Sequence, residues 1–323
     1  MKRFLTILMI AGLIKPIMAN DAKPLSVLFV TGRDTHGWGI HDHNPSTAVL
    51  SESLKKAMGD SVEIKEVWNA WPTEGDFAKA DVCVIYSDGW GSSVIKGPKR
   101  LNQIESFMNA GKGMLRIHWA TGSHRKDNQI SRTLFGGNME DKYSVHSTIW
   151  HQKFALGTHP ITSGMKPFEL VDECYFFMHW VDENKTGITD ILTAKPGPQF
   201  KARSVTPKAR ESLNRDEPQT LAWAFERPQG GRSFSYTGGH FHWDWANDNA
   251  RKMILNAIVW AGGYEVPKGG VNSPRPTAEH LLSFAAEKGK KKNPGWTAEA
   301  LQPLLEQMNR PGEKIDWRRP PLK

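Results

Sequence analysis

The sequence predicts an α/β protein built on a doubly wound, mostly parallel sheet with an inserted antiparallel region. Short β-rich runs alternate with helix patterns over the first half of the chain, which is the order that a parallel sheet with crossover helices requires. The helix patterns also have recognisable ends, and one strand runs into a glycine-rich turn. At 323 residues the chain is long enough for one large domain or two average ones.

Four strands and two helices are expected in this first half. The strands cover residues 25–31, 62–67, 81–86 and 112–118, and the helices cover residues 46–58 and 98–110. The second helix has Pro98 in its first turn, where a backbone N–H has no partner within the helix, and it stops at Gly111. The regular alternation predicts that all four strands lie in one sheet.

The second half is expected to be less regular. Its predicted pieces are antiparallel strands within residues 144–177, a surface loop over 196–218, a hairpin formed by 219–225 and 232–236, a closing helix over 249–261, and two helical patches at 277–288 and 297–308. The loop prediction rests on the absence of an apolar period. The two patches beyond Pro267 are expected to wrap the domain or to dock a partner.

The first 19 residues have the build of a secretory signal. Lys2 and Arg3 precede an apolar run, and Ala19 is the small residue before an expected cut. Because the run is too short to span a bilayer, the protein is expected to be exported, periplasmic or extracellular, with no membrane span after signal removal. An α/β domain is then expected over residues 20–264, followed by a C-terminal extension over 265–323.

The formal net charge of +8 is concentrated at the ends of the chain. Residues 21–264 carry 28 basic and 27 acidic side chains, whereas residues 265–323 carry eleven basic and seven acidic ones. The body is therefore nearly neutral, and the extension is basic. The lysine cluster at 288–292 is interpreted as a solvated linker, so no nucleic-acid partner is expected.

Neither cysteine is expected to act as a nucleophile. Cys83 and Cys174 lie in apolar stretches, which favours two buried free thiols over a disulfide. His118 instead occupies the end of the fourth strand, where a sharp elbow into a small-residue turn lifts one side chain above the carboxyl edge of the sheet. Thiolate acyl transfer is therefore excluded, and His118 is a candidate catalytic residue.

Further histidines follow the first and last strands of the predicted domain. They are His36, His41 and His43 after the first strand and His240 and His242 after the last. Because the carboxyl ends of parallel strands share one edge, these side chains are expected to meet there. The two His-x-His pairs admit a divalent metal ion held by His41, His43 and His242. The alternative is a metal-free polar and aromatic wall that binds sugar, and no nucleotide is expected in either case.

An acidic partner is expected from two adjacent carboxylates. Asp172 and Glu173 point to opposite faces of a strand, and Glu173 is favoured because Tyr175 lies on its side. Near His118 and His240, Glu173 is a candidate general base, or it holds one histidine in its working tautomer. The alternative is a loop acid that pairs with an arginine.

Aromatic side chains beside the histidines suit the apolar face of a sugar ring. The predicted substrate-binding residues are Arg33, His36, Trp38, Trp119, Tyr175 and Trp243. One pocket is expected to be lined by His36, His118, Glu173 and His240, with His41, His43 and His242 at its rim.

Several motifs, in this order along the chain, resemble the trehalose-utilisation (ThuA-like) family. They are Thr31-Gly32-Arg33 through His36-Gly37, Gly111-Lys112-Gly113 through His118, Phe135-Gly136-Gly137, His159-Pro160-Ile161-Thr162-Ser163-Gly164, Asp172-Glu173-Cys174-Tyr175, Gly238-Gly239-His240, and Leu255-Asn256-Ala257-Ile258-Val259-Trp260-Ala261. The resemblance runs from about Ser26 to Gly263 and implies a class I glutamine amidotransferase-like fold. The doubled histidine motif around His240 and His242 is similar to exported members from environmental bacteria.

The resemblance implies sugar catabolism, with 3-keto glycosides made by a partner sugar oxidoreductase as the expected substrates. A ketone at C3 acidifies the hydrogen on C2, so a His or Glu base removes that proton and the glycosidic oxygen leaves, or the proton returns on the other face. A metal or an imidazolium steadies the enolate. The alternative is a non-catalytic sugar-binding or assembly module with the extension as its docking element. The sequence leaves the oligomeric state open.

Overall fold

The computed structural model describes residues 23–288, 293 and 295–310. The secretory signal expected at residues 1–19 and most of the lysine cluster at 288–292 therefore lie outside the described residues. None of the helices in the described ranges is both long and apolar enough to cross a membrane.

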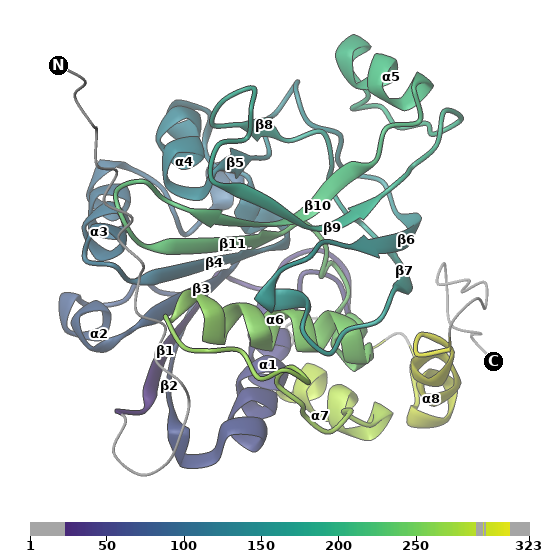
Figure 1. Cartoon of the computed structure of the whole chain (residues 1–323). Coiled ribbons are helices and arrows are strands. Elements are labelled where there is room, and N and C mark those ends of the chain that lie inside the picture. Colours follow the sequence, from purple (N-terminus) through teal and green to yellow (C-terminus); the bar gives the residue numbers. More distant parts are fainter. Residues whose placement is uncertain (1–22, 289–292, 294, 311–323) are drawn as a thin grey trace, which may run out of the picture.

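A nine-stranded sheet forms the centre of the fold, with strand order β2-β1-β3-β4-β11-β10-β9-β6-β7 (Figure 1). Its parallel half consists of β1 (Leu25–Thr31), β2 (Val62–Trp68), β3 (Val82–Tyr86), β4 (Gly113–Ile117) and β11 (Arg232–Tyr236). Its antiparallel half consists of β6 (Trp150–Leu156), β7 (Phe168–Asp172), β9 (Ile188–Ala194) and β10 (Gln219–Glu226). The predicted α/β class with a mostly parallel sheet is confirmed. The antiparallel region is not a separate layer, because β9 and β6 continue the same sheet.

Helices cover both faces of the parallel half. One face carries α1 (His43–Met58) and α6 (Asp248–Ala261), and the other carries α2 (Glu74–Lys79), α3 (Pro98–Asn109) and α4 (Asn128–Phe135). Alternate residues of β1 separate the two cores: Val27 and Phe29 pack with the first set of helices, whereas Leu28 and Val30 pack with the second. A short pair of strands, β5 (Gly137–Asn138) and β8 (His179–Trp180), lies apart from the main sheet.

The predicted surface loop at residues 196–218 is wrong over its second half, which forms α5 (Pro207–Asn214). The Thr206 hydroxyl accepts a hydrogen bond from the Ala209 N–H, and Pro207 occupies the first turn. Ala209 and Leu213 are both buried and lie four residues apart. Two apolar residues are too few to produce a recognisable helical period in a long segment that is otherwise mostly polar.

The C-terminal extension packs on the domain through α7 (Ala278–Lys288) and α8 (Ala298–Gln307). The His242 ring donates from Nε2 to the Leu281 carbonyl oxygen at 3.0 Å. The Trp296 ring stacks on Trp243 with a centroid separation of 4.6 Å and lies 5.6 Å from the ring of Trp38. The extension thus closes an aromatic cluster that the domain alone leaves open.

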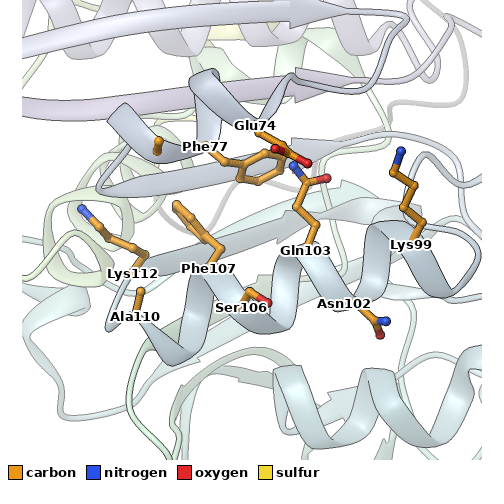
Figure 2. A pocket seen from close by; sticks show the side chains of 10 residues that line it. Glu74, Phe77, Lys99, Asn102, Gln103, Ser106, Phe107, Ala110 and Lys112 are labelled. Carbon is orange, nitrogen blue, oxygen red and sulfur yellow. The ribbon is translucent and has the colours of Figure 1, made fainter.

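A groove of about 490 Å³ lies between α2 and α3, with Phe77 and Phe107 among its lining residues. In Figure 2, Lys112 and Lys99 appear on opposite sides of these two phenylalanines. None of the histidines lines it. The candidate chemistry is therefore in a different cavity.

Candidate active site

Three histidines and one carboxylate converge at the end of the parallel half of the sheet. His41 Nε2 lies 3.0 Å from His118 Nε2 and 3.0 Å from His240 Nδ1, and the latter two atoms are 3.1 Å apart. Glu173 Oε2 lies 3.1 Å from His240 Nδ1 and 3.7 Å from His118 Nε2. One ligand atom from each of the four residues therefore lies within a single small volume.

Strand ends bring these residues together. His118 directly follows β4, with φ at +57° and a fully buried side chain, so a strained elbow does stand at the predicted position. His41 lies in the loop after β1, and its backbone N–H donates to the His240 carbonyl oxygen at 3.0 Å. That bond ties the loop after β1 to the loop after β11.

Glu173 comes from the opposite edge of the sheet, directly after β7. Asp172, the last residue of that strand, accepts hydrogen bonds from the backbone N–H groups of Glu173, Gly239 and His240 at 2.7, 2.6 and 3.1 Å. The carboxylate of Asp172 therefore holds two of the site residues through their backbones. It also brings the antiparallel half of the sheet back to the end of β11.

Hydrogen bonds at the far side of two rings fix their tautomers. His118 Nδ1 lies 3.0 Å from the Thr237 carbonyl oxygen, which only accepts, so this nitrogen carries the proton. His41 Nδ1 lies 2.6 Å from Asp88 Oδ1 and donates to that carboxylate. In the neutral form of each ring the Nε2 atom therefore presents a lone pair, and the two Nε2 atoms face each other.

Burial favours the neutral forms of His118 and Tyr175. Burial lowers the pKa of His118 well below its usual range, and the nearby rings of His41 and His240 lower it further. Tyr175 donates its hydroxyl to Glu173 Oε2 at 3.2 Å and lies 3.1 Å from His118 Nε2, and burial together with Glu173 raises the pKa of this tyrosine. A lone-pair nitrogen and a carboxylate oxygen thus remain available to a cation or a substrate proton.

A cavity of about 260 Å³ opens onto the cluster. Its lining residues are His36, His41, Trp90, Trp119, Met139, His146, Ser147, Glu173, Tyr175 and His240. Of the predicted pocket residues, His36, Glu173 and His240 line this cavity. His118 lies behind them without exposed surface, and His41 belongs to the centre rather than the rim.

The expected sharing of one cation by His-x-His partners is not what the structure shows. The fold directs His43 Nδ1 to the Arg33 carbonyl oxygen at 3.0 Å, because His43 starts α1 instead of extending a strand. His242 starts a 3-10 turn and is hydrogen-bonded to Ser46 and Leu281. The i, i+2 argument requires extended backbone, and neither pair has it.

Three predicted sugar-binding residues also lie elsewhere. Trp243 is buried in the aromatic cluster with Trp38 and Trp296, and neither Trp38 nor Trp243 lines the cavity. The Arg33 side chain is exposed and does not line it either. Trp119, Tyr175 and His36 do line the cavity.

Sequence reasoning missed four residues that shape the site. Asp88 follows β3 in the run Ser87-Asp88-Gly89, and an acid just past a central strand was a recognisable clue. Trp90, His146 and Ser147 come from long loops whose path only the tertiary structure defines.

Comparisons with known proteins agree with this architecture. The sequence profile of the family described as trehalose utilisation (ThuA) matches residues 26–261. A putative ThuA-like protein from Bacteroides uniformis ATCC 8492 superposes with a TM-score of 0.53 at 13% identity, covering 75% of this chain and 94% of that chain. A putative ThuA-like protein from Parabacteroides merdae ATCC 43184 gives a TM-score of 0.51 at 17% identity, covering 84% of this chain and 100% of that chain.

No curated protein matches the sequence. At these identities the two structures establish a shared fold, and the profile match over most of the chain establishes the family. The chain belongs to the ThuA, or trehalose-utilisation, family.

Proposed function

We propose that this protein is a carbohydrate-catabolic enzyme that acts on 3-keto glycosides with the help of one divalent metal ion. The observation that carries the proposal is the approach of His41 Nε2 to within 3.0 Å of His118 Nε2 beside a cavity, while the Nδ1 atom of each ring faces an acceptor. Two acceptor nitrogens at this separation repel each other unless a cation lies between them. His240 and Glu173 supply two further ligand atoms to the same cation.

The four residues fit a metal ion. Imidazole nitrogens and carboxylate oxygens bind such ions at about 2.0–2.2 Å, which separates neighbouring ligand atoms by about 3.0–3.6 Å. The separations quoted for this cluster extend from 3.0 to 3.7 Å. The Asp88 carboxylate behind His41 and the Thr237 carbonyl behind His118 are the outer partners that metal-bound histidines usually have. Mixed nitrogen and oxygen donors favour a transition-series divalent ion or zinc over magnesium or calcium.

Two tryptophans support a sugar ligand. Trp90 and Trp119 line the cavity, and the indole N–H of each is buried with no hydrogen-bond partner among the described residues. A buried donor without a partner costs free energy, and a sugar hydroxyl would remove that cost. The indole rings also offer apolar surface to the C–H face of a pyranose.

The chemistry follows from the ketone at C3. Glu173 removes the proton from C2 through the carboxylate oxygen that does not bind the cation, a C1–C2 double bond forms as the C1–O bond breaks, and the leaving oxygen takes a proton. His36 lines the same cavity on its exposed side and is the candidate donor of that proton. The metal ion, when bound, supplies Lewis-acid stabilisation of the enolate oxygen. Tyr175 orients Glu173 through its hydroxyl.

The substrate requires a partner sugar oxidoreductase that oxidises C3, and we place the reaction outside the cytoplasm because of the secretory pattern at residues 1–19. The alternative function is a non-catalytic sugar-binding or assembly module. The enclosed cluster of three histidines and a carboxylate favours an enzyme, since a binding wall has no need of opposed lone pairs.

The test combines metal analysis with turnover of 3-keto disaccharides and plain disaccharides. We expect about one divalent ion per chain, inactivation by chelator, and recovery on adding the ion back. His118→Ala should lose the ion and at least 10²-fold in turnover, whereas His151→Ala, on β6 outside the cavity, should keep both. Full activity of metal-free protein would refute the role of the ion. Cleavage of plain disaccharides alone would refute the keto-sugar assignment, and sugar binding without turnover would favour the binding module.

A further inference from the structure

A second, larger groove adjoins the cavity that holds the histidine cluster. It has a volume of about 600 Å³, and it shares His146 and Ser147 with the inner cavity of about 260 Å³. The inner cavity is slightly smaller than the roughly 300 Å³ at the lower end of small-ligand sites, whereas the groove lies well within that range. The inner cavity is therefore suited to one sugar ring, and a larger substrate must extend past these two residues.

The groove and the inner cavity share one wall, formed by His146 and Ser147, and hydrogen bonds hold this wall in place. The backbone N–H of His146 donates to the Ser204 hydroxyl at 2.9 Å, and that hydroxyl donates back to the His146 carbonyl oxygen at 2.7 Å. The preceding residue, Val145, exchanges two backbone hydrogen bonds with Phe176, at 2.9 and 3.1 Å. Phe176 directly follows Tyr175, so the wall is attached to the segment that carries Glu173.

The shared boundary also has a defined conformation. Ser147 has φ at +60°, which a side-chain-bearing residue rarely adopts, and its hydroxyl lies 2.7 Å from His146 Nδ1. The ring of His146 in turn packs edge-on against Trp90, with centroids 5.1 Å apart. The groove and the inner cavity therefore share one pre-organised boundary.

The lining of the groove is polar. Besides the shared pair and Val205, it consists of Thr148, Ser204, Thr206, Lys142, Arg203 and Asp141. Lys142 and Arg203 are exposed, and neither has an ion-pair or hydrogen-bond partner among the described residues. Hydroxyls and donors of this kind recognise the hydroxyl groups of a polyhydroxylated ligand.

We propose that this groove binds the leaving group of the glycoside, and that this group is a second sugar unit. The inference rests on the proposed function, because it assigns the reacting ring to the inner cavity. The glycosidic bond then lies beside His146 and Ser147, and the hydroxyls of the leaving sugar contact Arg203 and Thr148.

The test compares two substrates in the unaltered protein and in three variants. The substrates are a 3-keto disaccharide and the corresponding methyl 3-keto glycoside, which lacks the second sugar. In Arg203→Ala, and in Thr148→Val, we expect kcat/KM for the disaccharide to fall on the order of tenfold, mostly through KM, with the methyl glycoside unchanged. Lys208→Ala, an exposed cation on α5 outside the groove lining, is the matched control and should change neither. Equal effects on both substrates, or no effect on either, would overturn the proposal.

A binding measurement tests the assignment of the groove independently of the proposed function. If neither keto substrate is turned over, the proposed function fails, and calorimetry with the unoxidised disaccharide and its methyl monosaccharide glycoside decides the groove. Tighter binding of the disaccharide that is lost in Arg203→Ala supports a second sugar site. Equal affinities in the unaltered protein contradict it, and so does tighter binding of an acidic disaccharide than of a neutral one.

Discussion

His41 and His118 direct their Nε2 atoms at each other across 3.0 Å, although the Nδ1 atom of each ring already donates to its own acceptor. A neutral ring can supply a proton to the gap only by giving up the hydrogen bond on its far side, and burial disfavours the doubly protonated form of His118. The lone pairs of two neutral rings at this separation repel each other, and a cation bound by both rings relieves that repulsion. Binding of that cation should stabilise the fold as well as serve the reaction.

Asp88→Asn should weaken the affinity for a divalent ion by about 10- to 100-fold. The substitution keeps an acceptor for His41 Nδ1 but removes the negative charge that raises the basicity of the ring. A competition titration with a coloured chelator measures the change.

The control for this experiment is Asp190→Asn. Asp190 lies on β9, forms an ion pair with Lys185 and does not touch the cluster. If both variants bound the ion as tightly as the unaltered protein, Asp88 would only position the ring.

Asp172→Asn should lower the free energy of unfolding by about 3 kcal/mol. Both carboxylate oxygens of Asp172 accept backbone N–H groups, so one amide NH₂ would face a donor and leave buried groups unpaired. Urea denaturation at constant pH measures the loss. We also expect the variant to lose affinity for the divalent ion, because Glu173 and His240 shift with their backbones.

Asp244→Asn is the comparison for Asp172→Asn, and we expect it to lower the free energy of unfolding only slightly. Asp244 is fully buried beside Asp172, and burial together with that carboxylate raises its pKa well above the usual range. The protonated acid and an amide are similar neutral groups. Because a raised pKa makes stability fall as pH rises above about 4, Asp244→Asn should also flatten the dependence of stability on pH. A loss of stability as large as that of Asp172→Asn would show that Asp244 carries the negative charge.

His159→Asn should reduce the loss of stability between about pH 6.5 and pH 4. Burial, with a smaller contribution from Arg232, lowers the pKa of His159 to about 4. In this window the unfolded chain holds a proton that the folded chain does not, so stability falls as pH decreases, by up to about 1.4 kcal/mol per pH unit.

Asparagine preserves the local structure at this position. His159 Nδ1 accepts the Ile161 N–H at the start of a 3-10 turn, and asparagine is a good replacement at such a cap. Urea denaturation at several pH values gives the slope of unfolding free energy against pH for the unaltered protein and for His159→Asn. An unchanged slope would mean that His159 is accessible enough to titrate normally in the folded protein.

Trp296→Ala should cost about 3 kcal/mol or more of unfolding free energy, because it removes a buried indole that packs against Trp38 and Trp243. Thermal and urea denaturation measure this loss. Trp71→Ala, on the opposite side of the sheet beside Phe77, is a comparison that leaves the extension intact. Only Trp296→Ala should make the C-terminal helices sensitive to limited proteolysis.

The parallel half of the fold could be predicted from the sequence because its determinants are local. Buried β-rich runs such as 81–86 and helix boundaries such as Pro98 and Gly111 need no tertiary information. The elbow at His118 was predictable for the same reason. The helices α2 and α4 were missed because each has at most eight residues, too few for a clear period.

The cluster could be predicted only in part. Topology identified His118 and His240, since strand ends of one sheet meet at one edge. Glu173 was favoured over Asp172 because Tyr175 lies on the same side of the expected strand. The choice between His41 and His43 depends on where α1 begins, and the expected helix began at residue 46 rather than at His43. Similarly, the burial of Trp243 in the aromatic cluster depends on Trp296, which lies more than fifty residues later in the sequence.

The aromatic cluster at Trp38, Trp243 and Trp296 has a consequence for what counts as the folding unit. The family match ends at residue 261, yet the residue that covers Trp243 comes from the extension. A chain cut at Gly263 would expose a contiguous apolar surface directly beneath the loops that carry His41 and His240, and such surfaces promote self-association. The residues matched by the family and the residues that complete the packing around Trp243 therefore do not coincide, because the match leaves out both C-terminal helices.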